Sequence, residues 1–241
     1  MKYFVSADIH GFFNEWQKAL KEKGFEENNP NHKLIICGDL FDRGRQVKEI
    51  VEYVLAHMDR IILIRGNHED LLEEMIYRNY PCFADEKNGT FQTMLDLYDS
   101  YNFSNDNMSM IELASVVRLQ EILNVCRDYF ETEHYIFVHA FIPLDFNGEY
   151  DKYWRYASKN RFQSARWINP VLMYQKNIFE PGKTIVCGHW HCSAFWHEYD
   201  KDKYDEFGKR ARFDSFISEH IIAIDGCTIY SNIVNVLVID D

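Results

Sequence analysis

The stretch KLIICGDLFDRG, residues 33–44, decides the fold. Its first part, KLIIC, is apolar and rich in isoleucine, as buried β-strands are. Its second part, GDLFDRG, holds two aspartates, an arginine and two glycines directly after that predicted strand. Two carboxylates and a guanidinium at this place could form an ordinary solvated turn, or they could hold a phosphate group. The segments that follow the other predicted strands decide between these interpretations.

Short apolar runs of the same kind recur along the chain. They predict buried strands at residues 3–7, 34–37, 61–64, 135–138, 184–187, 221–224 and 233–239. Between the first three runs, residues 12–23 and 46–57 repeat apolar side chains at helical spacing. Strands that alternate with helices predict βαβ units and a largely parallel sheet with helices on its faces. We therefore expect an α/β fold.

The middle of the chain departs from this alternation. Residues 78–108 are polar and turn-rich, and residues 109–127 carry apolar positions at helical spacing. We interpret 78–127 as a mainly helical cap inserted between the strands of a single domain that spans residues 1–241. A second polar stretch, residues 197–215, is expected to form a loop or an edge hairpin before the last strands.

Composition narrows the class of protein. The net charge of −12 argues against nucleic acid as a partner, because a phosphate backbone requires a basic surface. The six cysteines form no CxxC pair, which indicates reduced thiols and not a zinc finger. The first apolar run is too short for a signal peptide, and no run approaches the ~20 apolar residues of a membrane span. We expect a cytoplasmic protein without a membrane partner, and the sequence does not indicate its oligomeric state.

A side chain that can bind metal follows each of five predicted strands. In open parallel sheets, ligands bind beyond the carboxyl ends of the strands, so these groups should converge on one edge. Taken singly, each could be a helix cap, a surface residue or a hydrogen-bonded core residue. Their joint occurrence predicts a metal centre. The candidate ligands are Asp8, His10, Asp39, Asn67, His139, His189 and His191.

The mixture of oxygen and nitrogen ligands predicts two divalent ions. Asp8 and His10 lie two residues apart and can bind one ion, to which His191 can return. Asp39 has two carboxylate oxygens and can bridge both ions. Such ligands suit Mn²⁺, which we expect, or Fe, Zn²⁺ or Ni²⁺, better than Ca²⁺. Two such ions can clamp a phosphoryl group and activate water. The second ion would take the neutral side chains, Asn67, His139 and His189.

The ordered motifs resemble those of the calcineurin-like metallophosphoesterase superfamily. They are DIHG (8–11), GDLFDRG (38–44), GNHE (66–69), the histidine at 139 and GHWH (188–191). Within that superfamily, DRG and GNHE look like the PPP-type serine/threonine protein phosphatases, especially the compact bacterial and phage members. The resemblance implies a β-sandwich of two mixed sheets flanked by helices, with the metal site at the strand ends. The sequence DGC at 225–227 also fits, although we expect Asp225 to have a structural role.

The resemblance also assigns roles in catalysis. All the candidate ligands except His191 match metal ligands of the PPP-type enzymes, and His191 matches the GHxH form of the wider superfamily. Arg43 matches the arginine that binds phosphate oxygens, and Asn67 counts among the substrate-binding residues. His68 matches the general acid, and Asp42 matches the carboxylate that orients it. The implied reaction is direct in-line attack of a metal-bound hydroxide on phosphorus, without a covalent enzyme intermediate.

Two positions depart from the PPP pattern. Phe141 follows His139-Ala140 where the pattern usually has glycine. The second phosphate-binding arginine of these enzymes has three candidates here, Arg155, Arg161 and Arg166. We expect Arg166, which precedes Trp167, to bind substrate and take part in catalysis.

The resemblance favours a serine/threonine protein phosphatase that acts on phosphorylated proteins. A dinucleoside polyphosphate hydrolase, such as a diadenosine tetraphosphatase, is the alternative, and a broad phosphodiesterase or phosphomonoesterase acting on small phosphoesters comes next. A catalytically silent scaffold of the same fold is the non-enzyme alternative. The presence of the ligands together with Arg43 and His68 argues against a scaffold.

Overall fold

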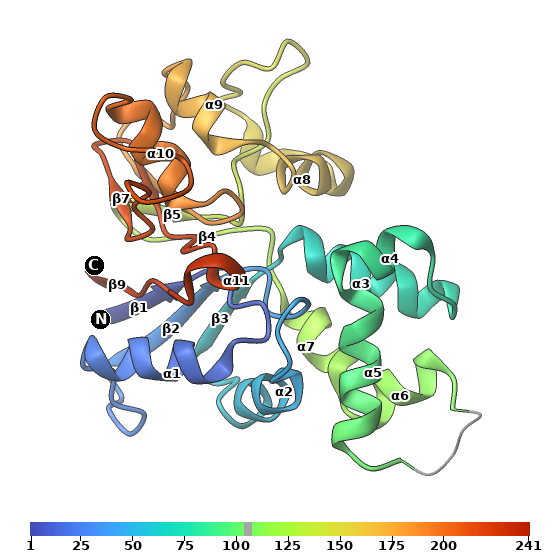
Figure 1. Ribbon diagram of the computed structural model, residues 1–241. Coiled ribbons are helices and arrows are strands. Elements are labelled where there is room, and N and C mark those ends of the chain that lie inside the picture. Colours follow the sequence, from blue (N-terminus) through green and yellow to red (C-terminus); the bar gives the residue numbers. More distant parts are fainter. Residues whose placement is uncertain (104–107) are drawn as a thin grey trace.

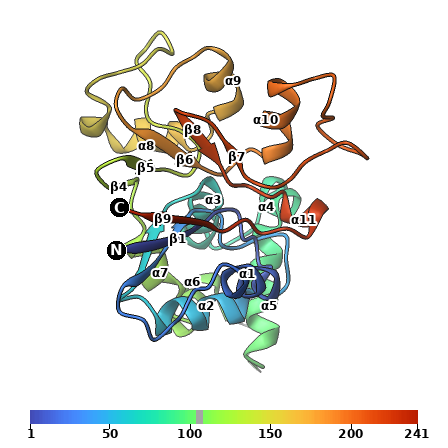
Figure 2. The same ribbon diagram turned by 90° about the vertical axis from the view of Figure 1, so that its left-hand side faces the viewer.

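The computed structural model describes residues 1–103 and 108–241, in which two β-sheets pack face to face (Figures 1 and 2). In the first sheet, β1 (Lys2–Ser6), β2 (His32–Cys37) and β3 (Ile61–Ile64) run parallel, with β2 in the middle of the three. The fourth strand, β9 (Leu237–Asp240), runs antiparallel beside β1. The strand order is therefore β3-β2-β1-β9.

The second sheet has the strand order β4-β5-β6-β8-β7. Its middle strands run parallel and its two edge pairs are antiparallel. Both sheets are therefore mixed, which confirms the predicted fold class. The edge strands were not predicted, because two residues are too short to show a hydrophobic period. The strands are β4 (Phe130–Glu131), β5 (Tyr135–Phe137), β6 (Thr184–Cys187), β7 (Phe216–Ile217) and β8 (Ile221–Ala223).

Alternation along the strands divides the core into three layers. Val5 and Ile35 face the second sheet, where they meet Phe137 and Val186 in a buried cluster between the sheets. Helices α1 and α2 cover the outer face of the first sheet, and α8 to α10 cover the second (Figure 1). No helix of the described ranges is long and apolar enough to cross a membrane. These helices are α1 (Phe13–Glu22), α2 (Val47–Ala56), α8 (Lys159–Ala165), α9 (Pro170–Gln175) and α10 (Cys192–Tyr199).

Four helices, here called the inserted helices, occupy the segment 78–127 after α3 (Asn67–Arg78). The part interpreted as turn-rich contains α4 and α5, because buried residues recur along α5 at helical spacing. The expected helix over 109–127 is two helices, since Arg118 has a left-handed backbone with φ 61°. Residues 104–107 of the expected cap lie outside the described residues. The inserted helices are α4 (Phe83–Asn88), α5 (Thr90–Ser100), α6 (Met110–Val116) and α7 (Leu119–Val125).

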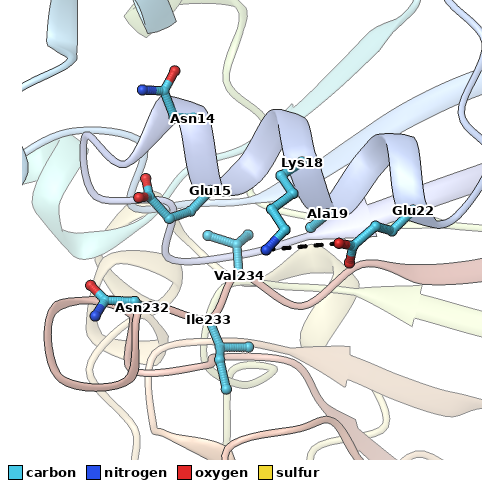
Figure 3. A pocket seen from close by; sticks show the side chains of 8 residues that line it. All are labelled: Asn14, Glu15, Lys18, Ala19, Glu22, Asn232, Ile233 and Val234. Carbon is cyan, nitrogen blue, oxygen red and sulfur yellow. Dashed lines mark ion pairs between the residues drawn. The ribbon is translucent and has the colours of Figure 1, made fainter.

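The polar stretch 197–215 begins within α10 and contains no strand, so the hairpin alternative was wrong. Two short helical elements complete the described chain, a 3-10 turn at Trp154–Tyr156 and α11 (Thr228–Ser231). A surface hollow of about 390 Å³ lies between α1 and residues 232–234, which precede β9. Figure 3 shows the side chains that line it. Its rim includes Lys18, which pairs with Glu22 at 3.9 Å. No predicted site residue lines this hollow.

Candidate active site

The predicted ligands lie in loops at the carboxyl ends of β1, β2 and β6, after β5, and at the first residue of α3. Several of these loop residues have left-handed backbone conformations, which non-glycine residues seldom adopt. Six of the predicted site residues share this feature. Such conformations concentrate at functional sites, where the surrounding structure maintains them. The residues and their φ angles are Asp8 (50°), His10 (49°), Asp39 (55°), Asp42 (71°), Arg43 (64°) and His189 (66°).

Asp39 lies at the centre of the cluster, between two sets of imidazoles. Its Oδ2 atom is 3.6 Å from His10 Nε2 and 3.9 Å from His68 Nε2. Its Oδ1 atom faces the other way and is 3.5 Å from His139 Nε2. A carboxylate whose two oxygens face separate groups of nitrogen ligands has the arrangement of a bridge between two cations.

Asn67 and His189 complete the side of the cluster that contains His139. The Asn67 Oδ1 atom lies 2.7 Å from His139 Nε2 and 3.0 Å from His189 Nδ1. The two ring nitrogens are 3.2 Å apart. Three polar atoms thus converge on one point, as the donor atoms around a metal ion do.

Backbone carbonyls orient two of the imidazoles. His10 Nδ1–H donates to the Phe41 carbonyl, and His139 Nδ1–H donates to the Cys37 carbonyl, both at 2.8 Å. Because Nδ1 carries the proton, the Nε2 atom of the neutral ring has a free lone pair directed at Asp39. This hydrogen bonding by the second ring nitrogen is typical of metal-binding histidines.

Asp8 closes the other side of the site. Its Oδ1 atom is 4.0 Å from His10 Nε2, and its Oδ2 atom accepts the backbone N–H of His189 at 2.9 Å. Gly188 lies so close that a Cβ atom there would overlap the Asp8 carboxylate. A residue without a side chain is therefore required for this approach of two sheets.

The electrostatics of the cluster fit bound cations. Burial raises the pKa of Asp8 well above its ordinary value, and the nearby Asp225 and Asp39 add to this shift. Burial lowers the pKa values of His10, His139 and His189, that of His189 to about 3, so these rings are neutral near pH 7. Neutral imidazoles and crowded buried carboxylates are a donor set that divalent cations would stabilise.

His68 and Asp42 form a buried pair beside the cluster. His68 Nδ1–H donates to Asp42 Oδ2 at 2.6 Å, and the Asp42 side chain is fully buried. Burial opposes protonation of His68, but the carboxylates of Asp39 and Asp42 outweigh it and raise the pKa of His68 above its ordinary value. Arg43 is exposed and its Nη2 atom lies 3.3 Å from His68 Nε2. The guanidinium thus stands at the mouth of the site, where an anion could reach it.

The structure does not bring His191 or Arg166 into this cluster. The ring nitrogens of His191 contact Ser193 Oγ at 2.9 Å and Glu206 Oε1 at 3.3 Å, and both are therefore engaged outside the set of candidate metal ligands. Arg166 is only 5% exposed, and its terminal nitrogens donate to Asp70 at 2.6 Å and to Asp128. The described contacts of Arg166 are those of a structural ion-pair network, and they give no support to the predicted role in phosphate binding.

The other two candidate arginines also form ion pairs with carboxylates of the protein. Arg155 pairs with Glu131 and Glu180, both at 2.9 Å, and Arg161 pairs with Asp151 at 2.6 Å. All three guanidinium groups therefore form ion pairs with carboxylates of the protein. In the sequence these arginines look like candidates for phosphate binding. The structure shows that each one binds carboxylates of the protein instead.

Sequence reasoning missed two groups that support the site. Glu69 is fully buried and accepts the backbone N–H groups of Asp39, Leu40 and Gly66 at 2.8–2.9 Å, which fixes the loop that carries Asp39. It belongs to the GNHE motif, which was the available signal. Thr90 and Thr93 on α5 bind Asp42. No sequence signal marked these two residues.

Asp225 has the structural contact that was expected, because its Oδ1 atom accepts the Cys227 N–H at 2.7 Å. Burial raises the pKa of Asp225 to about 6, and its charge contributes to the raised pKa of Asp8. Asp225 is therefore part of the electrostatic surroundings of the cluster.

The sequence profile of calcineurin-like phosphoesterases matches residues 1–211 of this chain. A symmetrical bis(5'-nucleosyl)-tetraphosphatase of Buchnera aphidicola is 31% identical over 123 residues, which are 51% of this chain and 39% of that protein. A zinc-dependent endopolyphosphatase of Saccharomyces cerevisiae is 29% identical over 115 residues, 47% of this chain and 34% of that protein. The chain thus matches about two fifths or less of the length of these relatives.

Solved structures share the fold at low sequence identity. A structure assigned provisionally as a diadenosine tetraphosphatase superimposes with a TM-score of 0.54 at 13% identity and covers 98% of this chain and 88% of that one. The cold-active protein tyrosine phosphatase of a psychrophilic Shewanella superimposes with a TM-score of 0.51 at 14% identity, covering 100% of this chain and 75% of that one. Since the family profile covers most of the sequence, this chain belongs to the calcineurin-like phosphoesterase family.

Proposed function

We propose that the protein hydrolyses phosphoesters with the help of two divalent cations, Mn²⁺ first among them. The observation that carries this proposal is the position of Asp39, whose two oxygens face separate sets of ligands beside the His68–Asp42 pair. Divalent cations in such a site polarise phosphoryl oxygens and lower the pKa of water. One ion would be held by Asp8, His10 and Asp39, and the other by Asp39, Asn67, His139 and His189.

The remaining residues bind the substrate and move a proton. Arg43 is a permanently charged, exposed fork at the mouth of the site and would bind phosphoryl oxygens. His68 would donate the proton from Nε2 to the departing oxygen, while Asp42 holds Nδ1–H and stabilises the imidazolium. The chain needs no covalent nucleophile for this reaction.

The His68–Asp42 pair favours substrates that have poor leaving groups. A serine or threonine alkoxide is a strong base and must be protonated as it departs, so a general acid raises the rate most for such esters. We therefore propose phosphoserine or phosphothreonine in proteins as the leading substrate class, in line with the resemblance of the DRG and GNHE motifs to PPP-type phosphatases.

A second candidate function is hydrolysis of dinucleoside polyphosphates. The names of several relatives support it, and so does Trp167, which is 51% exposed and whose ring centroid lies 6.1 Å from that of His189. An exposed indole at the edge of the site could stack on a nucleobase. A nucleoside diphosphate is a good leaving group and would depend less on His68.

Parallel assays test the proposal. The metal-free protein, with and without Mn²⁺, is given p-nitrophenyl phosphate, a phosphoserine peptide and diadenosine tetraphosphate, and phosphate or nucleotide release is measured. Mn²⁺-dependent release from the phosphopeptide supports the leading class, and preference for the dinucleotide supports the second. If calorimetry shows bound Mn²⁺ and no substrate is cleaved, the protein is a scaffold and the proposed activity is wrong.

A further inference from the structure

Asp42, the partner of the candidate general acid His68, is bound by side chains of α5, which lies outside the strand-end loops. Thr90 Oγ1 on α5 donates to Asp42 Oδ2 at 2.8 Å, and Thr93 Oγ1 donates to Asp42 Oδ1 at 2.7 Å. Thr93 Oγ1 also accepts the backbone N–H of Asp42 at 3.0 Å. Both threonines are buried, with exposures of 0% and 2%. One inserted helix therefore contacts the carboxylate that orients His68.

Three protein donors bind the Asp42 carboxylate. Its side chain has no exposed surface, and its two oxygens accept one imidazole N–H and two hydroxyl groups. A buried carboxylate is strongly unfavourable unless such donors surround it. Because the donors come from two elements, α3 and α5, and bind both oxygens, they hold the carboxylate and hence the His68 ring in place.

The backbone of the α4–α5 junction reinforces this arrangement. Gly89 has a left-handed φ of 88°, and a Cβ atom on it would lie 2.8 Å from the backbone nitrogen of Arg43. The junction therefore lies directly against the turn that holds Asp42 and Arg43. One turn further along α5, Asp96 pairs with Arg45 at 2.8 Å and fixes the helix to the same loop.

We propose that Thr90 and Thr93 are positioning residues for the proton-transfer step and that α5 holds His68 in its donating orientation. This inference rests on the proposed function. It gives α5 a role in catalysis. A purely structural role for the threonines is the competing explanation, and it predicts loss of stability with equal loss of activity toward all substrates.

Substrates with different leaving groups distinguish these explanations. Thr93→Val and Thr90→Val keep the volume of the side chain and remove the hydroxyl. We expect each to lower kcat for a phosphoserine peptide at least about tenfold more than kcat for p-nitrophenyl phosphate, because nitrophenolate departs without a proton and general acid catalysis contributes about 10²–10⁴-fold. KM should change little. Thr93→Ser, which restores the hydroxyl, should recover most of the loss.

Leu97→Ala is the matched control on α5. Leu97 is fully buried on this helix, and its side chain belongs to the apolar core cluster. The substitution should lower the thermal midpoint and reduce both activities by the same factor. If Thr93→Val also reduces both activities equally, or if Thr93→Ser fails to recover activity, the positioning role is wrong.

A measurement without turnover keeps this inference separate from the proposed function. The short bond between His68 and Asp42 should give a downfield proton resonance, assigned by its loss in His68→Asn. We expect Thr93→Val and Thr90→Val to shift or broaden this signal while Thr93→Ser and Leu97→Ala retain it. An unchanged signal in both valine variants would overturn the inference even if the protein hydrolyses phosphoesters. A silent wild-type enzyme would overturn only the proposed function.

Discussion

Asp39 Oδ1 and His139 Nε2 lie 3.5 Å apart, although the two residues follow strands of different sheets, β2 and β5. Their contact joins the two halves of the sandwich at the edge where both sheets end. His139 Nδ1–H also donates to the Cys37 carbonyl at the end of β2. The site therefore depends on the packing of one sheet against the other, and formation of the ligand set requires the complete sandwich.

The central position of Asp39 leads to a prediction about metal binding. Asp39→Asn removes the charge and one anionic oxygen between the two sets of ligands, so affinity for both ions should fall. Mutating a residue that only hydrogen-bonds to a metal ligand lowers metal affinity about 10–100-fold. Removing a ligand itself should lower the affinity for Mn²⁺ at least about 100-fold. Titration calorimetry with Mn²⁺ measures the effect. Asp59→Asn, at an exposed carboxylate, is the control, and loss of only one of two ions would contradict a bridging role.

Arg43 should contribute to transition-state stabilisation. Removing a charged donor to a phosphoryl group costs about 2.7–4 kcal/mol of barrier, so Arg43→Ala should lower kcat/KM for an aryl phosphate by about 10²–10³-fold. Arg210→Ala, at an exposed arginine paired with Asp205, is a matched control and should have a much smaller effect. A near-wild-type rate for Arg43→Ala would show that phosphate is bound elsewhere.

Arg166 should govern stability, because it is buried between two carboxylates. Arg166→Met leaves Asp70 and Asp128 without this partner. Asp70 keeps its ion pair with Arg65 at 2.6 Å and Asp128 is partly exposed, so the loss should stay below the roughly 3–5 kcal/mol of a fully buried pair, and the urea midpoint should still fall. Residual folded protein should keep its KM for aryl phosphate. A raised KM at unchanged stability would restore the role in phosphate binding that the sequence suggested.

The pH dependence of kcat should show whether His68 is the proton donor. Asp42 accepts the Nδ1–H of His68 and favours the protonated ring, and the acid step is lost once rising pH removes the proton from Nε2. With Mn²⁺ saturating, kcat for a phosphoserine peptide should therefore decline on the alkaline side. His68→Asn should lower kcat and remove that decline. If the variant keeps the alkaline decline, another group is the proton donor.

The sequence predicted the parts of the site that follow from strand order, and it did not predict those that depend on side-chain partners. Asp8, Asp39 and His189 could be expected at one edge because each follows an apolar run within two residues, and parallel strands bring such positions together. Arg166 could not be excluded, since a guanidinium that binds Asp70 has the same sequence pattern as one that binds phosphate. Thr90 could not be found either, because a threonine on a polar helix is ordinary unless its partner is known.

Asp225 leads to a prediction about the metal-free protein. Burial raises its pKa to about 6, so the folded state binds this proton more tightly than the unfolded chain does. Its ionisation therefore lowers stability as pH rises from about 4 to above 6, and the difference between the ordinary pKa of 3.8 and about 6 corresponds to roughly 3 kcal/mol. Asp225→Asn keeps an oxygen for the Cys227 N–H but cannot ionise.

Urea unfolding of metal-free wild type and Asp225→Asn at pH 4.5 and pH 7.5 measures this effect. The variant should gain clearly more stability relative to wild type at the higher pH than at the lower one. Saturating Mn²⁺ should reduce the difference, because bound cations would stabilise the carboxylates of Asp8, Asp39 and Asp225 in their charged forms. Equal differences at both pH values would show that Asp225 is ionised in the folded protein as readily as in water.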